Sequence, residues 1–282
     1  MKSSPNQKGQ TMPVITLSTD FGWDDPYVGI MKGVILGINP RASLVDITHG
    51  LSAHRLLEAT FKLTTAAAYF PHGTIHLAVV DPGVGGVRRP IMIKTREYYW
   101  IGPDNGLFTR ILQAFPDFRV FHLTNPKYFL KPVSHTFHGR DIFAPAAAHL
   151  SRGLSLAVLG NPIFDPVLLD LPEPAVKKNA LIGRVLYADR FGNLITNLSR
   201  EVMKDRMADL DIRDIRIRIG TRTIQGLHEN YARGEPGRLL TLFGSSGYLE
   251  IACNLGSAAE MVGYVPGKIL DVKVNTGGKG NI

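Results

Sequence analysis

The sequence has a single cysteine, no long apolar run and no segment that concentrates charge of one sign. With Cys253 as the only cysteine among 282 residues, an intrachain disulfide and a cysteine-based metal cage are excluded, and a reducing compartment is favoured. No stretch approaches the roughly 20 apolar residues of a membrane span. Residues 1–12 are polar and lack the apolar stretch of a signal sequence, so we expect a disordered tail and a cytoplasmic protein without a membrane partner.

Positive charge is in excess but evenly spread. The formal net charge is +8, and residues 1–172 and 173–282 each hold 16 Lys+Arg and 12 Asp+Glu. Nucleic-acid-binding proteins usually gather their positive charge on one face or in one segment. We therefore expect no nucleic-acid partner, whereas a small anionic metabolite or simple solubility would fit this diffuse excess.

Several catalytic motifs are also missing. The sequence has no GxxxxGK[ST] phosphate-binding loop, and Gly83-x-Gly85 fails the dinucleotide fingerprint because Arg88 occupies the position of the third glycine. No serine or cysteine lies in a recognisable nucleophile elbow. Kinase, dehydrogenase and serine-hydrolase functions are therefore not expected.

Strand and helix patterns alternate over the first part of the chain. Strand signals occur at 14–17, 44–47, 75–80 and across 91–101, and helical spacing occurs at 27–38, 53–70, 107–115 and 143–150. This alternation predicts an α/β/α sandwich with a largely parallel sheet over residues 13–172. Ligands of such sheets lie beyond the carboxyl ends of the strands, which makes the loops after the first three strands candidate sites.

The pattern changes in the second part of the chain. Residues 163–180 are rich in proline and lose periodicity, which predicts a domain boundary near residue 172. From residue 181 on, short apolar segments are separated by turns, and we expect an all-β, barrel-like domain over residues 173–282. Alternation at the end of Ile212–Ile219 predicts a half-exposed strand whose arginines face solvent or a neighbouring chain.

The segment Val79–Arg88 is the most informative part of the sequence. An apolar strand leads directly into Asp81 and a turn with one proline and three glycines, and Arg88 follows seven residues after the acid. Pro82 fixes one backbone torsion, whereas the glycines would let a small ligand lie against the main chain. A tight turn with a surface arginine gives the same pattern, so Asp81 and Arg88 are candidates that other segments must support.

The loop after the first strand, Ser18–Tyr27, holds three acids among aromatic residues. Asp20 is the candidate here, because a carboxylate can accept two hydrogen bonds from the vicinal diol of a ribose. Asp24 or Asp25 could cap the helix that follows, and the acids could instead bind a hard metal ion.

A second cluster, His135–Asp141, places two histidines beside an arginine and an acid ahead of a predicted helix. His138 is the candidate functional group of this cluster. Two alternatives stay open: zinc ligation by His135 and His138, and a structural turn capped by Asp141.

Two segments of the second part could bind a flat ligand. In Asp189–Asn197, the aromatic ring of Phe191 could stack on a base whose edge amide groups such as Asn193 could recognise, although Gly192-Asn193 is also a good hairpin turn. The stretch Phe243–Leu249, with Asn254 after it, offers small residues and main-chain donors. Alone, this stretch is better explained as a turn between strands.

Seven motifs follow one another along the chain. They are Ser18–Gly22, Asp46–His49, Asp81–Gly85 with Arg88, Pro103–Gly106, Thr136–Asp141, Phe191–Asn193 with Thr196-Asn197, and Ser246–Leu249. In this order the sequence, from about Val14 to about Val274, resembles the S-adenosyl-L-methionine (SAM) hydrolases. These enzymes are also called SAM hydroxide adenosyltransferases and are relatives of the fluorinase and chlorinase.

The resemblance implies an N-terminal α/β domain, a C-terminal β-barrel-like domain and a homotrimer with active sites between neighbouring subunits. It also implies a reaction without a cofactor, in which SAM and water give adenosine and methionine. The water-holding triad of that family falls on Asp81, Arg88 and His138. The implied substrate contacts are Asp20 to the ribose diol, Asp189 to the methionine amino group, Phe191, Asn193 and Tyr231 around adenine, and Ser245, Ser246 and Asn254 as further polar contacts.

The chemistry of the reaction is compatible with these residue types. Attack at the ribose C5′ expels a neutral thioether, so no general acid is required, and the difficulty lies in the nucleophile. Because bulk water has a pKa of about 15.7, a site without a metal must stabilise hydroxide-like charge with a fixed cation and hydrogen bonds. Arg88 can supply the cation, His138 can hydrogen-bond or accept a proton, and Asp81 can orient either partner and fix the histidine tautomer.

Three alternatives remain open for this sequence. A halogenase-like reaction is disfavoured, because Gly139 stands where the halogenases present a serine to the halide and the fluorinase's long insertion is absent from Val87–Pro103. A metal-dependent hydrolase would use Asp20, Asp24, His135 and His138. A noncatalytic SAM or adenosine sensor would use the triad only for binding.

Overall fold

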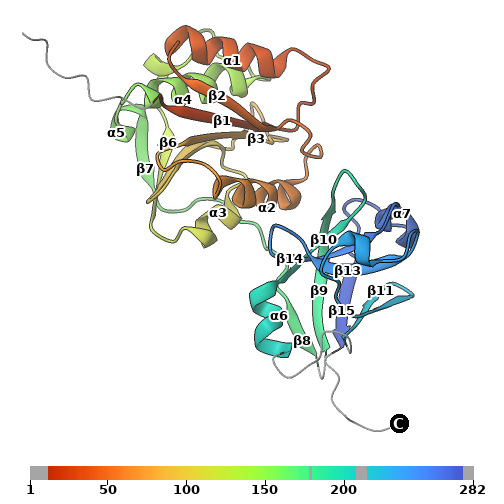
Figure 1. Ribbon diagram of the computed structural model, residues 1–282. Helices are drawn as coiled ribbons and strands as arrows, with labels where there is room; N and C mark the ends of the chain where they lie inside the picture. The colour runs from red at the N-terminus through yellow and green to blue at the C-terminus, as the bar shows by residue number, and fades with distance from the viewer. Residues whose placement is uncertain (1–11, 178–179, 208–214, 276–282) are drawn as a thin grey trace, which may run out of the picture. The chain divides into compact units, whose positions relative to one another are not determined.

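The computed structural model describes residues 12–177, 180–207 and 215–275. The chain divides into two compact units, one up to Leu169 and one from Asp170 on (Figure 1). The SAM-hydrolase-like motifs before residue 142 lie in the first unit, and those after residue 188 lie in the second.

The first unit is built on a seven-stranded sheet. Its strands, in spatial order, are β2 (Ser43–Thr48), β1 (Val14–Thr19), β3 (Ile75–Val79), β5 (Tyr99–Pro103), β4 (Pro90–Thr95), β6 (Phe118–Leu123) and β7 (Gly160–Ile163). The first three neighbouring pairs are parallel and the last three are antiparallel. The predicted α/β fold is confirmed, with a sheet that is mixed, because the short turn between β4 and β5 forms a hairpin and a hairpin pairs its strands antiparallel.

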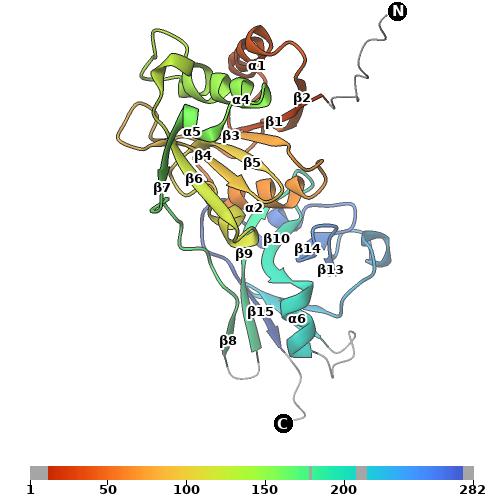
Figure 2. The ribbon, with the colours of Figure 1, turned by 90° about the vertical axis from the view of Figure 1, so that its left-hand side faces the viewer.

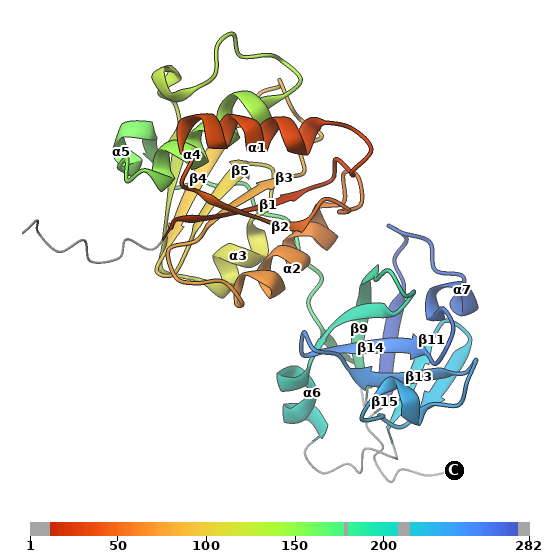
Figure 3. The same cartoon turned by 45° about the horizontal axis from the view of Figure 1, so that its top comes forward.

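Helices cover both faces of this sheet (Figures 1 and 3). On one face, α1 (Tyr27–Ile38), the π-helical turn η2 (Gly139–Phe143) and α4 (Ala144–Ser151) pack on β1 and β3 through residues such as Leu17 and Phe143. On the other face, α2 (Leu56–Ala67) and α3 (Thr109–Ala114) pack around the fully buried Trp100. The short elements η1 (Pro126–Tyr128) and α5 (Leu156–Leu159) complete the unit. The carboxyl ends of β1, β3 and β5 therefore share one open edge of the sandwich.

The second unit is an antiparallel sheet that curls toward closure (Figure 2). Its strand order is β12 (Arg222–Gln225), β11 (Arg216–Ile219), β15 (Asp271–Asn275), β9 (Ala180–Ala188), β10 (Leu194–Ser199), β14 (Tyr248–Cys253) and β13 (Leu239–Phe243), with β8 (Ala175–Lys177) also paired to β9. His228, just after β12, forms a bridge with Leu242 of β13, so the two edges of the sheet approach each other. This confirms the predicted barrel-like domain. The helices are α6 (Arg200–Met207), the 3-10 turn η3 (Tyr231–Arg233) and α7 (Ala258–Val262).

Two further observations concern the side chains of β11 and the length of the helices. In β11 the arginines are exposed and Ile217 and Ile219 are buried, as the alternation predicted, whereas residues 212–214 lie outside the described residues. Among the described residues, no helix combines the length and the apolar character needed to cross a bilayer.

Candidate functional site

The loop that follows β3 brings Asp81 and Arg88 into a two-pronged ion pair. Nε of Arg88 donates to Oδ1 of Asp81 at 2.9 Å, and Nη2 donates to Oδ2. Both side chains are nearly buried, with 8% of Arg88 and 5% of Asp81 exposed. Fork-to-fork pairing of this kind fixes the plane of the guanidinium as well as its position.

Glycine is required in this loop at Gly85. Its φ of +77° suits glycine, and a Cβ added there would lie 2.1 Å from the carbonyl oxygen of His135. The backbone of the 81–88 loop therefore packs directly on the segment that precedes His138. This close approach joins two motifs that are 50 residues apart in the sequence.

His138 is hydrogen-bonded to the same guanidinium as Asp81. Nη2 of Arg88 lies 2.7 Å from Nδ1 of His138. Since a guanidinium can only donate, Nδ1 must be an acceptor, and the imidazole is neutral with its proton on Nε2. Burial lowers the pKa of His138, and the adjacent Arg88 cation lowers it further, which favours the same neutral form. Arg88, rather than Asp81, therefore sets the tautomer.

One nitrogen of Arg88 is left over. Three of the five N–H groups of its guanidinium are used by Asp81 and His138. Nη1 is buried and has no hydrogen-bond partner among the described residues. The guanidinium also lies over the ring of Phe143, 5.3 Å from its centroid. The site therefore holds a fixed cation with a buried donor that none of the described residues uses.

Hydrogen bonds from the loop after β5 support the Asp81–Arg88 loop. Sequence reasoning did not identify this support. Nδ2 of Asn105 donates to the carbonyl of Val80 at 2.9 Å, immediately before Asp81. Arg89 donates to Asp104 at 2.8 Å and to Asp165 at 2.8 Å. The signal was present in the Pro103–Gly106 motif, which follows a strand of the same edge, but no role was assigned to it.

Asp20 lies after β1 at this same edge. Its Oδ2 accepts a hydrogen bond from the backbone N–H of His54 at 3.2 Å. The neighbouring Thr19 bonds to Nδ1 of the buried His49 at 2.8 Å, and Nε2 of His49 lies 2.9 Å from Asp46. This chain of hydrogen bonds anchors the loop that carries Asp20. The sequence analysis had named the Asp46–His49 motif but had given it no function.

The His135–Asp141 segment contains both a structural acid and the functional candidate. Asp141 is fully buried and accepts from the backbone N–H of Ser134 at 2.8 Å and from Arg140. It therefore holds the turn from which His138 projects, as the structural alternative expected of that acid. Within the described part of the chain, no group of three or more His, Cys, Asp or Glu is arranged to hold a metal ion.

The candidates of the second unit gather around one cavity of about 680 Å³. Its lining includes Asp189, Phe191, Asn193, Tyr231, Ser245 and Asn254, together with Glu250 and Cys253. Ser246 is not part of this lining, and Asp20 belongs to the first unit. Of the residues that line this cavity, two are acids and none is lysine or arginine.

Asp189 organises the hairpin that presents Phe191. Its Oδ1 accepts the backbone N–H groups of Phe191 and Asn193, each at 2.9 Å, and its Oδ2 accepts Nδ2 of Asn193 at 2.9 Å. A carboxylate has about four acceptor positions, so Oδ2 keeps one for a ligand. The ring of Phe191 is 77% exposed and available for stacking.

Glu250 is a cavity residue that sequence reasoning missed. It accepts a hydrogen bond from the hydroxyl of Tyr231 at 2.7 Å, which fixes that ring against the cavity. Burial raises the pKa of the Glu250 carboxyl, and Asp189 adds to the rise. Burial and the bond to Glu250 also raise the pKa of Tyr231. Glu250 occurs within a strand pattern, where alternation alone does not mark it as facing a ligand.

Comparison with known proteins also divides the chain into an N-terminal and a C-terminal domain. Residues 15–160 match the SAM hydroxide adenosyltransferase N-terminal domain, and residues 183–271 match the C-terminal domain of the same family. The chain belongs to the SAM hydroxide adenosyltransferase family. The resemblance stated from the motifs is thereby confirmed. The (R)-S-adenosyl-L-methionine hydrolase of Thermus thermophilus is 39% identical over 262 residues, covering 90% of this chain and 97% of that protein.

The chain is also similar to a more distant enzyme and to a solved structure. A fluorinase of Nocardia brasiliensis is 26% identical over 300 residues, covering 93% of this chain and 97% of that enzyme. The crystal structure of an uncharacterized conserved protein from Thermotoga maritima matches with a TM-score of 0.86 and 35% identity, covering 93% of this chain and 99% of that one. In the present chain, a Cβ added to Gly139 would lie 3.1 Å from the sulfur of Met31 and 3.2 Å from the ring of Phe137. A side chain at position 139 would therefore require these two neighbouring side chains to shift by a few tenths of an ångström.

Proposed function

We propose that this chain hydrolyses SAM to adenosine and L-methionine by in-line attack of water on the ribose C5′. The observation that carries the proposal is the buried Nη1 of Arg88, a cationic donor that has no hydrogen-bond partner in the described part of the chain. Membership of the SAM hydroxide adenosyltransferase family supports the reaction type. The reaction needs no cofactor, because the departing thioether is neutral and the nucleophile is water.

Arg88 stabilises the oxygen nucleophile. Nη1 donates to the attacking oxygen while Nε and Nη2 remain bound to Asp81 and His138. Because these contacts fix the guanidinium before the substrate arrives, no reorganisation is needed as negative charge develops on the oxygen.

His138 and Asp81 have separate tasks. His138, neutral and protonated on Nε2, donates a hydrogen bond and orients the water. It does not serve as the base in this arrangement, since Nδ1 is occupied by Arg88. Asp81 balances the charge of Arg88, and its remaining lone pairs accept the proton that water loses as the C5′–O bond forms and the C5′–S bond breaks.

The second unit supplies the substrate contacts of the proposal. Phe191 stacks on adenine beside Asn193 and Tyr231, and the free acceptor position of Asp189 binds the methionine amino group. Ser245, Ser246 and Asn254 are the further polar contacts, and Asp20 of the first unit binds the ribose diol. The two acids of the cavity favour a cationic substrate such as SAM over a neutral nucleoside. A homotrimer with active sites between neighbouring subunits and a cytoplasmic location complete the proposal.

Adenosine release provides the test. Purified protein is mixed with SAM, and adenosine and methionine are followed by chromatography with and without EDTA. We expect equimolar products, activity that survives EDTA, and loss of activity in Arg88→Ala but not in Arg222→Ala, an exposed arginine of β12. Activity abolished by EDTA would support the metal-dependent alternative, and tight SAM binding without adenosine would support the sensor.

A further inference from the structure

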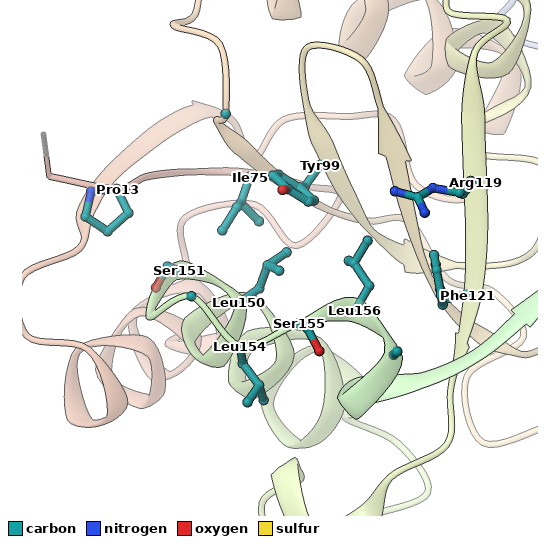
Figure 4. A pocket seen from close by; sticks show the side chains of 13 residues that line it. Pro13, Ile75, Tyr99, Arg119, Phe121, Leu150, Ser151, Leu154, Ser155 and Leu156 are labelled. Atoms are coloured by element: carbon teal, nitrogen blue, oxygen red, sulfur yellow. The ribbon is translucent and has the colours of Figure 1, made fainter. Parts of the chain in front are cut away.

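A second cavity lies in the first unit, at the end of the sheet where β3 begins. Asp81 follows the opposite end of that strand. The cavity has a volume of about 540 Å³, within the range of roughly 300–1,000 Å³ typical of small-molecule sites. Figure 4 shows Ile75 and Tyr99 on one wall and Leu150, Leu154 and Leu156 on the other. Ile75 begins β3, whose five residues separate this cavity from the Asp81 loop by on the order of 16 Å.

The strand register places a row of side chains on one face of the sheet, and three of them, Ile75, Tyr99 and Arg119, line this cavity. Ile75 pairs with Tyr99, Tyr99 with Lys94, and Lys94 with Arg119. Residues directly opposite one another on neighbouring strands point to the same face of a sheet. The row therefore runs from an apolar end at Ile75 to a basic end at Arg119, and in Figure 4 the Arg119 side chain extends toward Tyr99.

The basic end of the row carries positive charge that the described residues neutralise only in part. Lys94 and Arg119 are like charges directly opposite each other, an arrangement that is destabilising without a counter-ion. The ammonium of Lys94 lies 4.1 Å from the ring centroid of Tyr99, and the nearby carboxylate of Glu97 offsets part of its charge. Arg119 has neither an ion pair nor a hydrogen bond within the described residues.

We propose that this cavity binds a small anion with an apolar tail, such as a medium-chain carboxylate. The tail lies between the sheet row and Leu150, Leu154 and Leu156, where its burial is favourable. The carboxylate is bound by Arg119, with Lys94 contributing to the positive potential. The apolar body and the basic end of the cavity together select this ligand class over a neutral amphiphile or an inorganic anion.

Octanoate is the probe, and octanamide is its uncharged match. Binding to the full-length protein is followed by the methyl and amide NMR shifts of the first unit. We expect saturable binding of octanoate in the millimolar range, as its small size allows, and octanamide weaker by about tenfold or more. Arg119→Gln should weaken octanoate by about tenfold and leave octanamide unchanged. Arg222→Gln should change neither.

Filling the cavity provides an independent check. Ala157 lines the cavity and is exposed, so Ala157→Trp can occupy the space with little effect on folding. This variant should abolish the binding of both probes while SAM turnover continues, which separates the inference from the proposed function. Equal binding of octanoate and octanamide, full binding by Arg119→Gln, or absence of saturable octanoate binding would each overturn the inference.

Discussion

Replacing Arg88 with lysine separates the positive charge of this residue from its geometry. Lysine keeps the charge but has a single nitrogen on a flexible stem. It can therefore pair with Asp81, but it cannot at the same time hold His138 and present a donor to the attacking water. Arg88→Ala removes both charge and geometry and provides the lower limit.

The expected magnitude follows from the contacts that are lost. Losing one preorganised donor to a developing oxyanion costs about 10²–10³ in kcat. Because Nη1 contacts the nucleophile only and not the rest of the substrate, kcat and kcat/KM should fall by the same factor in Arg88→Lys. In Arg88→Ala the 5%-exposed Asp81 loses its cation, and the free energy of unfolding should drop by about 3–5 kcal/mol.

The assay is adenosine formation under single-turnover conditions, with stability measured in parallel by urea unfolding. Arg222→Lys, on an exposed strand position, is the matched control and should match the wild type in both measurements. If Arg88→Lys retained more than about half of the wild-type kcat, the role assigned to Nη1 would be refuted.

Three further predictions follow from the titration and packing of single residues. Burial and Arg88 lower the pKa of His138, so activity should be complete above that pKa and should fall only below pH 6.5. A pH profile of kcat in which activity is already lost at or above pH 6.5 would contradict the neutral tautomer. Burial lowers the pKa of His76 to about 3, so its contribution to stability should be complete above pH 6.5 and be lost as pH falls toward 3, by roughly 1 kcal/mol per pH unit. Urea unfolding at neutral and acidic pH should show a smaller loss in His76→Gln, and an equal loss would count against this assignment. Gly85→Ala should lower kcat about tenfold or more, because the added methyl group displaces the loop from His135. Gly237→Ala, at a residue with a similar φ of +72° and open space around it, should lower stability alone. Equal activity in the two variants would rule out the close contact at Gly85.

Local patterns predicted most of the elements, and specific residues explain the exceptions. The helix at 27–38 has the predicted bounds. The helix predicted at 53–70 spans 56–67, because His54 has a φ of +62°, which is incompatible with a helix. The mixed pairing was missed because the turn between Thr95 and Tyr98 was not recognised as a reversal of the chain.

In the candidate site, too, the local pattern was predicted and the long-range contacts were not. The spacing of Asp81 and Arg88 marked the loop, because a strand ending in an acid and a glycine-rich turn is a local pattern. The bonds from Arg89 to Asp165 and from Asn105 to Val80 span 76 and 25 residues. Such contacts depend on which strands are neighbours, and hydrophobic periodicity does not encode that order.

The central claim is that water attacks the C5′ carbon of SAM. The most direct measurement is to run the reaction in oxygen-18-labelled water and to determine by mass spectrometry where the label appears. We predict one labelled oxygen in adenosine, at its 5′-hydroxyl, and unlabelled methionine. Label in methionine, unlabelled adenosine, or release of free adenine in place of adenosine would contradict the account.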